Sequence, residues 1–511
     1  MEHFDVLIIG AGLSGIGAGA HLRMECPEKT FAILEGRERS GGTWDLFRYP
    51  GVRSDSDMFT LGYRFRPWTE SKAIADGPSI LRYIRETSAE YDLDKTIRYG
   101  HRVRRAEWSS EEARWTIEAE TMAVGRISSQ GDGDSKENAD LPQSRENAKE
   151  PQSKTLTFTC NFLYLCTGYY EYESGYTPDW PGFAEYAGTV IHPQKWPESL
   201  DFAGKKVLVI GSGATAVTLV PAMAETAEHV TMLQRSPTYV ISMPSEDKLA
   251  NFFRSLLPSK AGYALTRWKN VLRQTFFYEL SKKRPSIMKW LIAKGVSKEL
   301  GDEMAEKHFK PSYNPWNQRL CLVPDSDLFA SIRDGRASVV TGEIETFTES
   351  GVRLKNGDAI DADIIVTATG LKLKIMDGLT LVVDGKTVDL STKLAYKGMM
   401  YNDVPNLAQA FGYTNASWTL KCDLTSEYVC RLMKHMDKFG FTQCVPRLKD
   451  ASVKREPVLD FNSGYVLRAL DTLPGQGSKQ PWRLHQNYVK DVSLIRFGRL
   501  EDGTMEFTGR K

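Results

Sequence analysis

Residues 4–37 read FDVLIIGAGLSGIGAGAHLRMECPEKTFAILEGR, and this stretch decides the fold. An apolar run, a glycine turn, a helix-forming segment and a second apolar run follow in the order typical of a βαβ unit. Gly10 permits the tight turn, Gly12 lets a pyrophosphate approach the backbone, and Gly15 allows the helix to pack closely on the strand. Glu35 ends the second run, where a carboxylate accepts hydrogen bonds from ribose hydroxyls and repels a 2′-phosphate. The stretch therefore predicts a site for FAD or NAD rather than NADP.

A second unit of the same kind opens near residue 205, in KKVLVIGSGATAVTLVPAMAETAEHVTMLQR (205–235). Gly211 and Gly213 form its turn together with Thr215, and an alanine takes the third small position. This unit ends its second strand in Arg235 instead of a carboxylate, and a guanidinium donates well to a 2′-phosphate. An arginine on the surface at a strand end is the alternative. With Glu35 in the first unit, the pair predicts one FAD and one NADPH, the cofactors of a flavin oxidoreductase.

The remaining patterns predict an α/β fold with two Rossmann-like dinucleotide-binding domains. Residues 1–185 are interpreted as the first part of the FAD-binding domain, in which the polar tract 125–154 is a disordered loop. Residues 186–325 are interpreted as the NADP-binding domain, with a helical insertion at 247–310. Residues 326–511 complete the NADP domain to about residue 370 and return to the FAD domain. The FAD domain is thus split in sequence, with the NADP domain inserted into it.

The composition restricts the class of protein further. The 511 residues are 41% hydrophobic and 26% charged, as in ordinary globular proteins, and the net charge of +1 argues against extensive nucleic-acid binding. Seven cysteines without a Cys-x-x-Cys pair exclude a disulfide scaffold and a dithiol reductase. No cluster suggests a metal site. The chain begins almost directly with a strand and has no long apolar run, so a cytoplasmic location is expected.

The helical insertion is strongly basic, although the net charge of the whole chain is close to zero. Between Phe252 and Lys298 lysines and arginines alternate with aromatic residues, and Glu279 is the only acidic residue. Three interpretations stay open: a cap over the substrate entrance, a surface for peripheral contact with anionic lipid, and a surface for self-association.

Two motifs carry a resemblance to a known family. GGTWDLFRYPGVRSD (41–55) and YAGTVIHPQKWP (186–197) resemble the signature and fingerprint of type I Baeyer–Villiger flavin monooxygenases. In the fingerprint the chain keeps Gly188, His192 and Trp196, but a tyrosine replaces the usual phenylalanine. Other segments resemble the mycobacterial ethionamide-activating subgroup, and the tract 125–154 has no counterpart in that pattern.

This resemblance implies a reaction and its residues. In the family NADPH reduces FAD, O₂ adds to the flavin, and the flavin peroxide converts ketones to esters or lactones or oxidises sulfides and thioamides. Arg319, in NPWNQR, matches the catalytic arginine, which would stabilise anionic oxygen, and Asp55 matches the aspartate that orients it. Thr43, Trp44 and Val103 match further positions that bind FAD.

The same resemblance assigns three more roles. His192 and Trp196 would couple the two nucleotide units, although a buried histidine and a core tryptophan explain them almost as well. Trp418, in GYTNASWTLK, matches a segment of the substrate pocket, with core packing as the alternative. Gln318 replaces a lysine that holds the 2′-phosphate in many members, which leaves more of that contact to Arg235.

Three other functions remain open at this point. The nearest is a flavin monooxygenase that oxidises nitrogen or sulfur but not ketones. An NADPH oxidase that releases hydrogen peroxide would need an occluded pocket. A regulatory nucleotide-binding protein is disfavoured because both Asp55 and Arg319 are present.

Overall fold

A computed structural model describes residues 1–121, 154–318, 320–458 and 463–509. Nine strands form the first sheet in the order β18-β17-β4-β5-β6-β1-β2-β3, and β21 pairs with β6 beside β5. These strands are β1 (Glu2–Ile9), β2 (Phe31–Leu34), β3 (Ile97–Arg98), β4 (His101–Ser109), β5 (Arg114–Thr121), β6 (Lys154–Leu165), β17 (Thr380–Val383), β18 (Lys386–Thr387) and β21 (Leu407–Gln409). Strands β6, β1, β2 and β21 run parallel, so their carboxyl ends meet at one edge.

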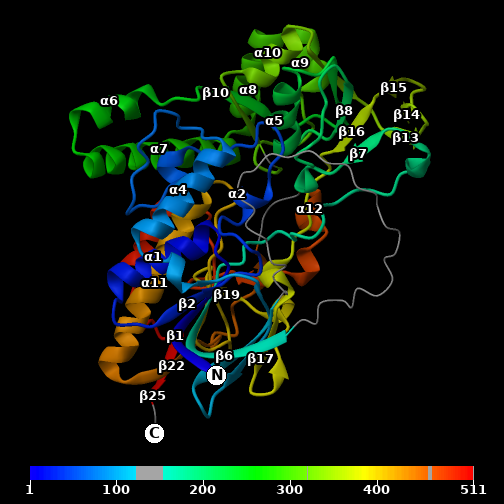
Figure 1. Ribbon diagram of the computed structural model, residues 1–511. Coiled ribbons are helices and arrows are strands. Elements are labelled where there is room, and N and C mark those ends of the chain that lie inside the picture. Colours follow the sequence, from blue (N-terminus) through cyan, green and yellow to red (C-terminus); the bar gives the residue numbers. More distant parts are fainter. Residues whose placement is uncertain (122–153, 319, 459–462, 510–511) are drawn as a thin grey trace, which may run out of the picture.

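A second, smaller sheet is parallel throughout and has the order β12-β9-β8-β16-β7. Its strands are β7 (Thr189–Ile191), β8 (Lys206–Ile210), β9 (His229–Gln234), β12 (Ala337–Thr341) and β16 (Ile364–Thr367). An antiparallel sheet of β13 (Ile344–Phe347), β14 (Gly351–Leu354) and β15 (Ala359–Asp361) packs beside it. Figure 1 shows the first sheet in the lower half of the molecule and the second at the upper right. Two sheets with helices on their faces confirm the expected α/β class.

Helices cover both sheets because their apolar faces need a partner. Helices α1 (Leu13–Glu25) and α11 (Trp418–Phe439) pack together on the first sheet, with α4 (Gly77–Glu90) next to α1. Most residues of α11 are buried, because other parts of the chain cover nearly all sides of this helix. Helices α5 (Ala214–Met223) and α10 (Asp327–Arg333) pack on the second sheet.

Short elements complete the chain. They are α2 (Thr43–Leu46), α3 (Met58–Leu61), α12 (Gly464–Leu467), α13 (Tyr488–Asp491), β19 (Ala395–Tyr396), β20 (Met400–Tyr401), β22 (Phe441–Pro446), β23 (Arg455–Pro457), β24 (Gly475–Gly477) and β25 (Met505–Gly509).

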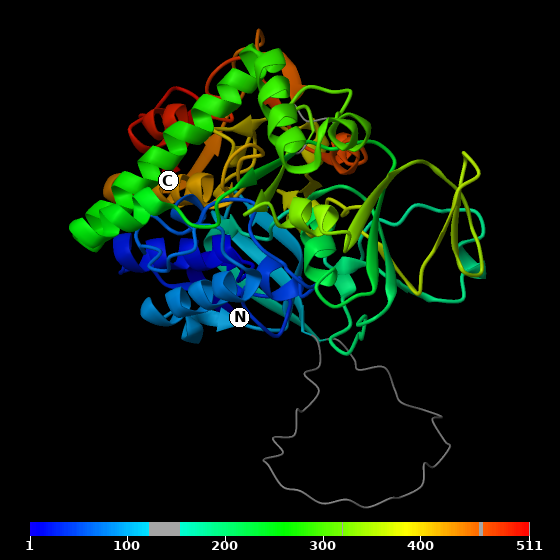
Figure 2. The ribbon, with the colours of Figure 1, turned by 90° about the horizontal axis from the view of Figure 1, so that it is seen from above.

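The helical insertion leaves the second unit between the paired strands β10 (Val240–Met243) and β11 (Cys321–Pro324). Its helices are α6 (Lys248–Leu256), α7 (Ser259–Lys283), α8 (Pro285–Leu300) and α9 (Asp302–His308). Asp247 caps α6 by accepting from the amide of Ala250 (3.0 Å), and a proline opens α8 where a missing N–H costs nothing. Helices α6 and α7 lie side by side and form an outer edge of the molecule (Figures 1 and 2).

Buried charges attach α7 to the first unit. Arg267, in the middle of α7, is only 3% exposed and donates to the carbonyls of Phe59 (2.9 Å) and Gly62 (2.6 Å). Its guanidinium also contacts the carboxylate of Asp423 in α11 at 3.1 Å. Because a buried charge without partners is very costly, these contacts fix the position of α7.

Three observations concern expectations from the sequence. The tract 125–154 lies outside the described residues except for Lys154, which begins β6 and is therefore not part of a loop. No helix of the described chain is long and apolar enough to cross a membrane. Within the same ranges no group of three or more histidine, cysteine or acidic residues could hold a metal ion.

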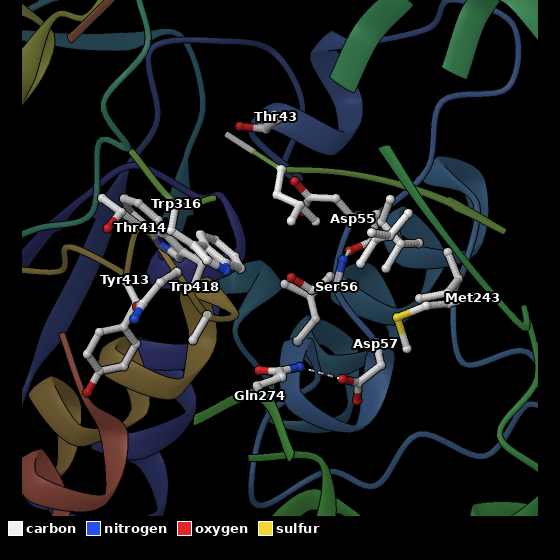
Figure 3. A pocket seen from close by; sticks show the side chains of 18 of the residues that line it. Thr43, Asp55, Ser56, Asp57, Met243, Gln274, Trp316, Tyr413, Thr414 and Trp418 are labelled. Atoms are coloured by element: carbon white, nitrogen blue, oxygen red, sulfur yellow. Dashed lines mark hydrogen bonds between the residues drawn. The ribbon is translucent and has the colours of Figure 1, made fainter. Parts of the chain in front are cut away.

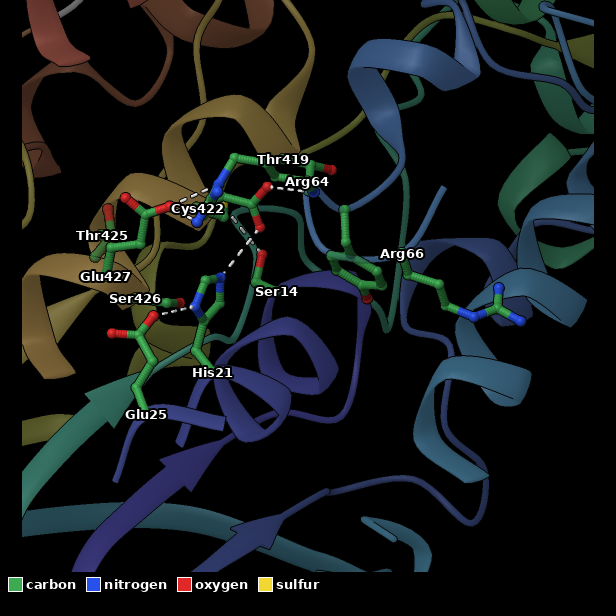
Figure 4. Close-up of polar contacts among 12 residues, drawn as sticks. Ser14, His21, Glu25, Arg64, Arg66, Thr419, Cys422, Thr425, Ser426 and Glu427 are labelled. Atoms are coloured by element: carbon green, nitrogen blue, oxygen red, sulfur yellow. Dashed lines mark hydrogen bonds and ion pairs between the residues drawn. The ribbon is translucent and has the colours of Figure 1, made fainter. Parts of the chain in front are cut away.

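A buried ionic cluster links α1 to α11 (Figure 4). His21 is 1% exposed; its Nδ1 lies 3.1 Å from Glu25 and its Nε2 lies 3.5 Å from Asp423. Burial opposes its protonation, but the two carboxylates outweigh burial and raise the pKa of His21 to about 9. The imidazolium is thus the folded form at neutral pH.

His21 should make the protein less stable in mild alkali. A pKa raised from 6.5 to about 9 stabilises the folded state fully below pH 6.5, and this contribution is lost as the pH rises to about 9. The expected loss is about 3 kcal/mol, measured by urea unfolding across that range. His21→Gln should flatten the dependence, while the exposed control His3→Gln should keep it. An unchanged slope in His21→Gln would contradict the assignment.

Candidate active site

At two positions the first glycine turn has no room for a side chain. Gly10 has φ +102°, and a Cβ there would lie 2.6 Å from the carbonyl oxygen of Cys166. A Cβ on Gly15 would lie 1.8 Å from the carbonyl oxygen of Gly10, so only glycine lets α1 approach β1 this closely. Gly42 faces the turn, with its Cβ position 3.0 Å from the Cα of Gly12. Two bare backbone segments therefore face each other at the N-terminus of α1, a cradle that fits a pyrophosphate.

Glu35 lies beside this cradle at the carboxyl end of β2. Its side chain is 7% exposed and accepts hydrogen bonds from the amides of Ala11 (2.7 Å) and Arg37 (2.9 Å). Burial raises the pKa of Glu35, and these two amides oppose that change. The amide of His101, at the start of β4, donates to the Glu35 carbonyl (2.8 Å), and Val103 is buried two residues further along that strand. The geometry fits a carboxylate held ready for a ribose.

One cavity of about 920 Å³ extends from the cradle to the helical insertion. Five of the residues singled out in the sequence line it: Gly12, Thr43, Trp44, Asp55 and Trp418. Figure 3 shows Thr43, Asp55 and Trp418 around this space. They come from four separate segments of the chain, which the fold brings together at the carboxyl edge of the first sheet. This is where ligands bind in open parallel sheets.

Trp418 forms part of the cavity wall at the start of α11. Its indole N–H donates to the hydroxyl of Ser14 in α1 (2.9 Å), and its ring stacks on Tyr169 with centroids 4.8 Å apart. A Cβ on Gly412 would lie 2.4 Å from the indole, so the ring fills the space against that backbone. The sequence analysis missed Tyr169, although its position just after β6 at the carboxyl edge was a usable signal.

Asp55 belongs to a loop that is attached to the second unit. Gly51 in this loop has φ +73°, and its Cβ position lies 2.8 Å from the Cβ of Ala222 in α5. Arg53 makes a bidentate ion pair with Asp327 of α10, in which one N–O distance is 3.3 Å. The loop therefore bridges the two units, while Asp55 itself lines the cavity.

Arg319 lies outside the described residues. Trp316 and Leu320, on either side of it in the chain, both line the cavity. Gln318 is half-buried next to it.

The second glycine turn repeats the first with one difference. Gly211 has φ +136°, and a Cβ there would lie 2.3 Å from a carbonyl oxygen just after β16. Around the Cβ position of Gly213 there is nothing within 4 Å, so this turn is open to an incoming nucleotide. Thr215 lies in the first turn of α5. Arg235 is exposed just after β9, at the carboxyl edge of the second sheet.

The fingerprint residues lie along the second sheet. Tyr186, which replaces the usual phenylalanine, donates its hydroxyl to a carbonyl before β16 (2.8 Å), so the extra oxygen has a partner. A Cβ on Gly188 would lie 2.3 Å from that hydroxyl. His192 Nε2 lies 3.1 Å from the carbonyl oxygen of Gly370, and burial lowers the pKa of His192. Trp196 packs on the edge of the second core. These contacts lie within the second unit, and the role of His192 and Trp196 in coupling the two units stays a prediction.

Comparison with known proteins identifies the class. Residues 145–394 match the family model described as "Flavin-binding monooxygenase-like", and residues 8–72 match "NAD(P)-binding Rossmann-like domain". The chain is 50% identical to the FAD-containing monooxygenase EthA of Mycobacterium tuberculosis over 100% of its own length and 98% of the relative's. The protein is therefore a member of the flavin-binding monooxygenase-like family, and it is an FAD-dependent enzyme.

Solved structures share the fold. The oxidised steroid monooxygenase bound to NADP has a TM-score of 0.74 and 21% identity, and the match covers 99% of this chain and 100% of that one. Cyclohexanone monooxygenase in an open crystal structure has a TM-score of 0.73 and 18% identity, with both chains covered completely. The expected fold class, with two dinucleotide-binding units, is confirmed by these matches.

The close backbone approach in the first turn yields a prediction. Gly15→Ala should displace α1 from β1, expel most of the FAD and destabilise the protein by at least about 3 kcal/mol, because the new methyl group meets a backbone carbonyl. The flavin absorbance per protein and thermal unfolding measure both effects. Gly213→Ala is the matched control, since its Cβ has open space, and it should retain FAD. Full flavin content in Gly15→Ala would contradict the role of this turn.

Proposed function

We propose that the protein is an NADPH- and O₂-dependent Baeyer–Villiger monooxygenase that converts apolar ketones to esters or lactones and also oxidises sulfides and thioamides. The observation that carries the proposal is the shared cavity: Asp55, Gly12 of the first glycine turn, and Trp316 and Leu320 from the segment around Arg319 border the same space. Cyclohexanone monooxygenase, whose name gives a ketone, has the same fold.

The residues fit both cofactors. The pyrophosphate of FAD would be held by Gly10, Gly12 and Gly15. Glu35 would bind the ribose of FAD. The ring system would be bordered by Thr43 and Trp44. The pyrophosphate of NADPH would be held by Gly211, Gly213 and Thr215. The exposed Arg235 would bind the 2′-phosphate of NADPH. When bound, FAD reduced by NADPH supplies the activation of O₂.

The chain itself contributes charge and exclusion of water. Arg319, as a permanent cation, would stabilise negative charge that develops on oxygen, and Asp55 would orient that guanidinium. Arg319 would donate hydrogen bonds to the reacting oxygen atoms and Asp55 would act only through Arg319, so neither has to transfer a proton. An apolar wall strengthens these interactions because it excludes water.

The lining of the cavity supports an apolar substrate. On the side of the insertion the wall consists mainly of apolar side chains: Phe277, Met288, Leu291, Ile292 and Leu322. Near the first glycine turn, the aromatic rings of Tyr169 and Trp418 close the wall. A pocket of this kind binds a hydrophobic molecule and leaves its one polar group to a few fixed partners.

The catalytic assignment is tested by Arg319→Ala. The variant should keep FAD and its reduction by NADPH, while ester formation falls by two to three orders of magnitude, about 3–4 kcal/mol of transition-state stabilisation. Product analysis with linear, cyclic and aryl ketones and with thioethers measures this loss. Arg353→Ala, exposed in β14, is the control, and Arg273→Ala tests the arginine of α7 that also lines the cavity.

Three results would contradict parts of the proposal. Ester formation near the wild-type rate in Arg319→Ala would exclude the assignment of Arg319. Loss of the activity only in Arg273→Ala would transfer the role to Arg273. Oxidation of thioethers without any turnover of ketones in the wild-type enzyme would indicate a monooxygenase of nitrogen and sulfur instead.

Coenzyme choice is tested at Arg235. Arg235→Ala should raise the KM for NADPH about tenfold or more and leave that for NADH almost unchanged, because only NADPH carries the 2′-phosphate. Arg336→Ala, which removes a guanidinium that pairs with Asp334 beside β12, should change neither constant. Equal losses for both coenzymes would mean that Arg235 supports the fold instead.

A further inference from the structure

Helix α7 has a buried face of mixed polarity and, opposite to it, an exposed apolar face. Its buried face carries Tyr263, Thr266, Arg267, Asn270 and Val271, which pack on the first unit. The opposite face carries Leu265, Trp268, Leu272 and Phe276, which are 40–62% exposed. Their spacing of three and four residues places them on one stripe along the helix. Packing within the chain therefore accounts for the buried face and not for the exposed apolar one.

The neighbouring helices of the insertion repeat this pattern. Leu249, Phe252 and Leu256 of α6 are 46–65% exposed and follow the same three- and four-residue spacing. On α8, Ile287 and Trp290 are 46% and 59% exposed. Three consecutive helices thus each present an apolar stripe to solvent. We call these exposed residues of α6, α7 and α8 the insertion surface. An exposed apolar area of this extent marks a binding site rather than chance exposure.

The charge of the insertion surface indicates which kind of partner it binds. Between Phe252 and Lys298 the only acidic residue is Glu279, and it is paired with Lys283. Lys260, Arg284 and Lys294 are exposed within the same stretch. A basic surface with tryptophan and phenylalanine between the charges is complementary to an anionic lipid interface, where aromatic rings enter the headgroup region and cations bind phosphate.

The insertion surface is continuous with the cavity. Phe277 and Leu291 are 43% and 41% exposed, and both also line the cavity. Lys298 lines the cavity as well and is exposed. Exposed apolar side chains of α7 and α8 therefore border the cavity and offer an apolar path into it. A molecule dissolved in a bilayer could follow it without crossing water.

We propose that the insertion surface binds reversibly to anionic membranes and that the cavity receives its apolar substrates from the lipid phase. The helices lie in the headgroup layer, since none of the described helices can span a bilayer. This association is independent of the reaction at the flavin, so its test measures binding and not turnover.

The test uses the full-length holoenzyme and sedimentation with vesicles. With phosphatidylglycerol vesicles at low salt most of the protein should sediment, and at about 0.5 M salt the bound fraction should fall several-fold as the charges are screened. With pure phosphatidylcholine the protein should stay in the supernatant. A supernatant fraction unchanged by phosphatidylglycerol at low salt would overturn the proposal.

Matched variants test whether vesicle binding depends on the insertion surface or on exposed apolar residues in general. Leu272→Ser, Phe276→Ser and Trp290→Ser together should lower vesicle binding at least tenfold, and the fold should persist because all three side chains are exposed. Phe439→Ser, at the end of α11 and 53% exposed, is the control and should bind like the wild type. Equal vesicle binding by the triple variant and the wild type would also overturn the proposal.

A second copy of the chain is the competing occupant. Light scattering without lipid distinguishes self-association from lipid binding. A monomeric protein that also binds vesicles supports the lipid interface. A dimer that the triple variant converts to a monomer would show that the insertion surface joins two copies, and it would replace the lipid proposal.

Discussion

The whole site depends on one close approach of backbone to backbone in the first glycine turn. The Cα of Gly15 lies so near the carbonyl of Gly10 that no side chain fits between them, and this contact sets α1 against β1. Once α1 is placed, its N-terminus points at the cradle formed with Gly42, and α11 packs along its side. Trp418 then reaches Ser14 and completes the cavity wall. The position of this cavity wall is thus a consequence of glycine geometry some 400 residues earlier in the chain.

A second constraint comes from charge that cannot reach water. Asp57 accepts hydrogen bonds from Asn270 (2.9 Å) and Gln274 (2.8 Å) of α7, and Arg267 reaches Asp423. Removing one member of such a buried set typically costs about 3–5 kcal/mol, so these contacts hold α7 rigidly on its inner side. The inner face of the insertion is therefore a fixed wall, while its outer face is free to meet another surface.

The sequence was informative where the chemistry is local. Both glycine turns, Glu35 and Arg235 could be placed at the ends of strands because a dinucleotide site needs a fixed order of elements over about 30 residues. The partners of Asp57 could not be predicted, since Gln274 lies 217 residues away and nothing local links them. Tyr169 was missed for a similar reason: its partner Trp418 comes from a distant helix.

The helical insertion shows another limit of sequence patterns. In most helices the apolar residues, which recur with a period of 3.6, mark the buried face. Helix α7 departs from this rule, because it buries Arg267 and Asn270 and exposes Leu272. The sequence therefore indicated helix and charge in this region without indicating which residues face inward. Only the contacts of Arg267 and Asn270 decide the orientation.

The bridging loop has a mechanical consequence. Gly51 rests on α5 and Asp55 lines the cavity, and the four peptide units between them span at most about 14 Å. The loop is too short to allow a large rotation of one unit relative to the other. The ion pair of Arg53 with Asp327 restricts the loop further. Any rotation of the second unit is therefore transmitted to the carboxylate in the cavity. The tight contact between α5 and this loop thus links the placement of the second unit to the position of Asp55.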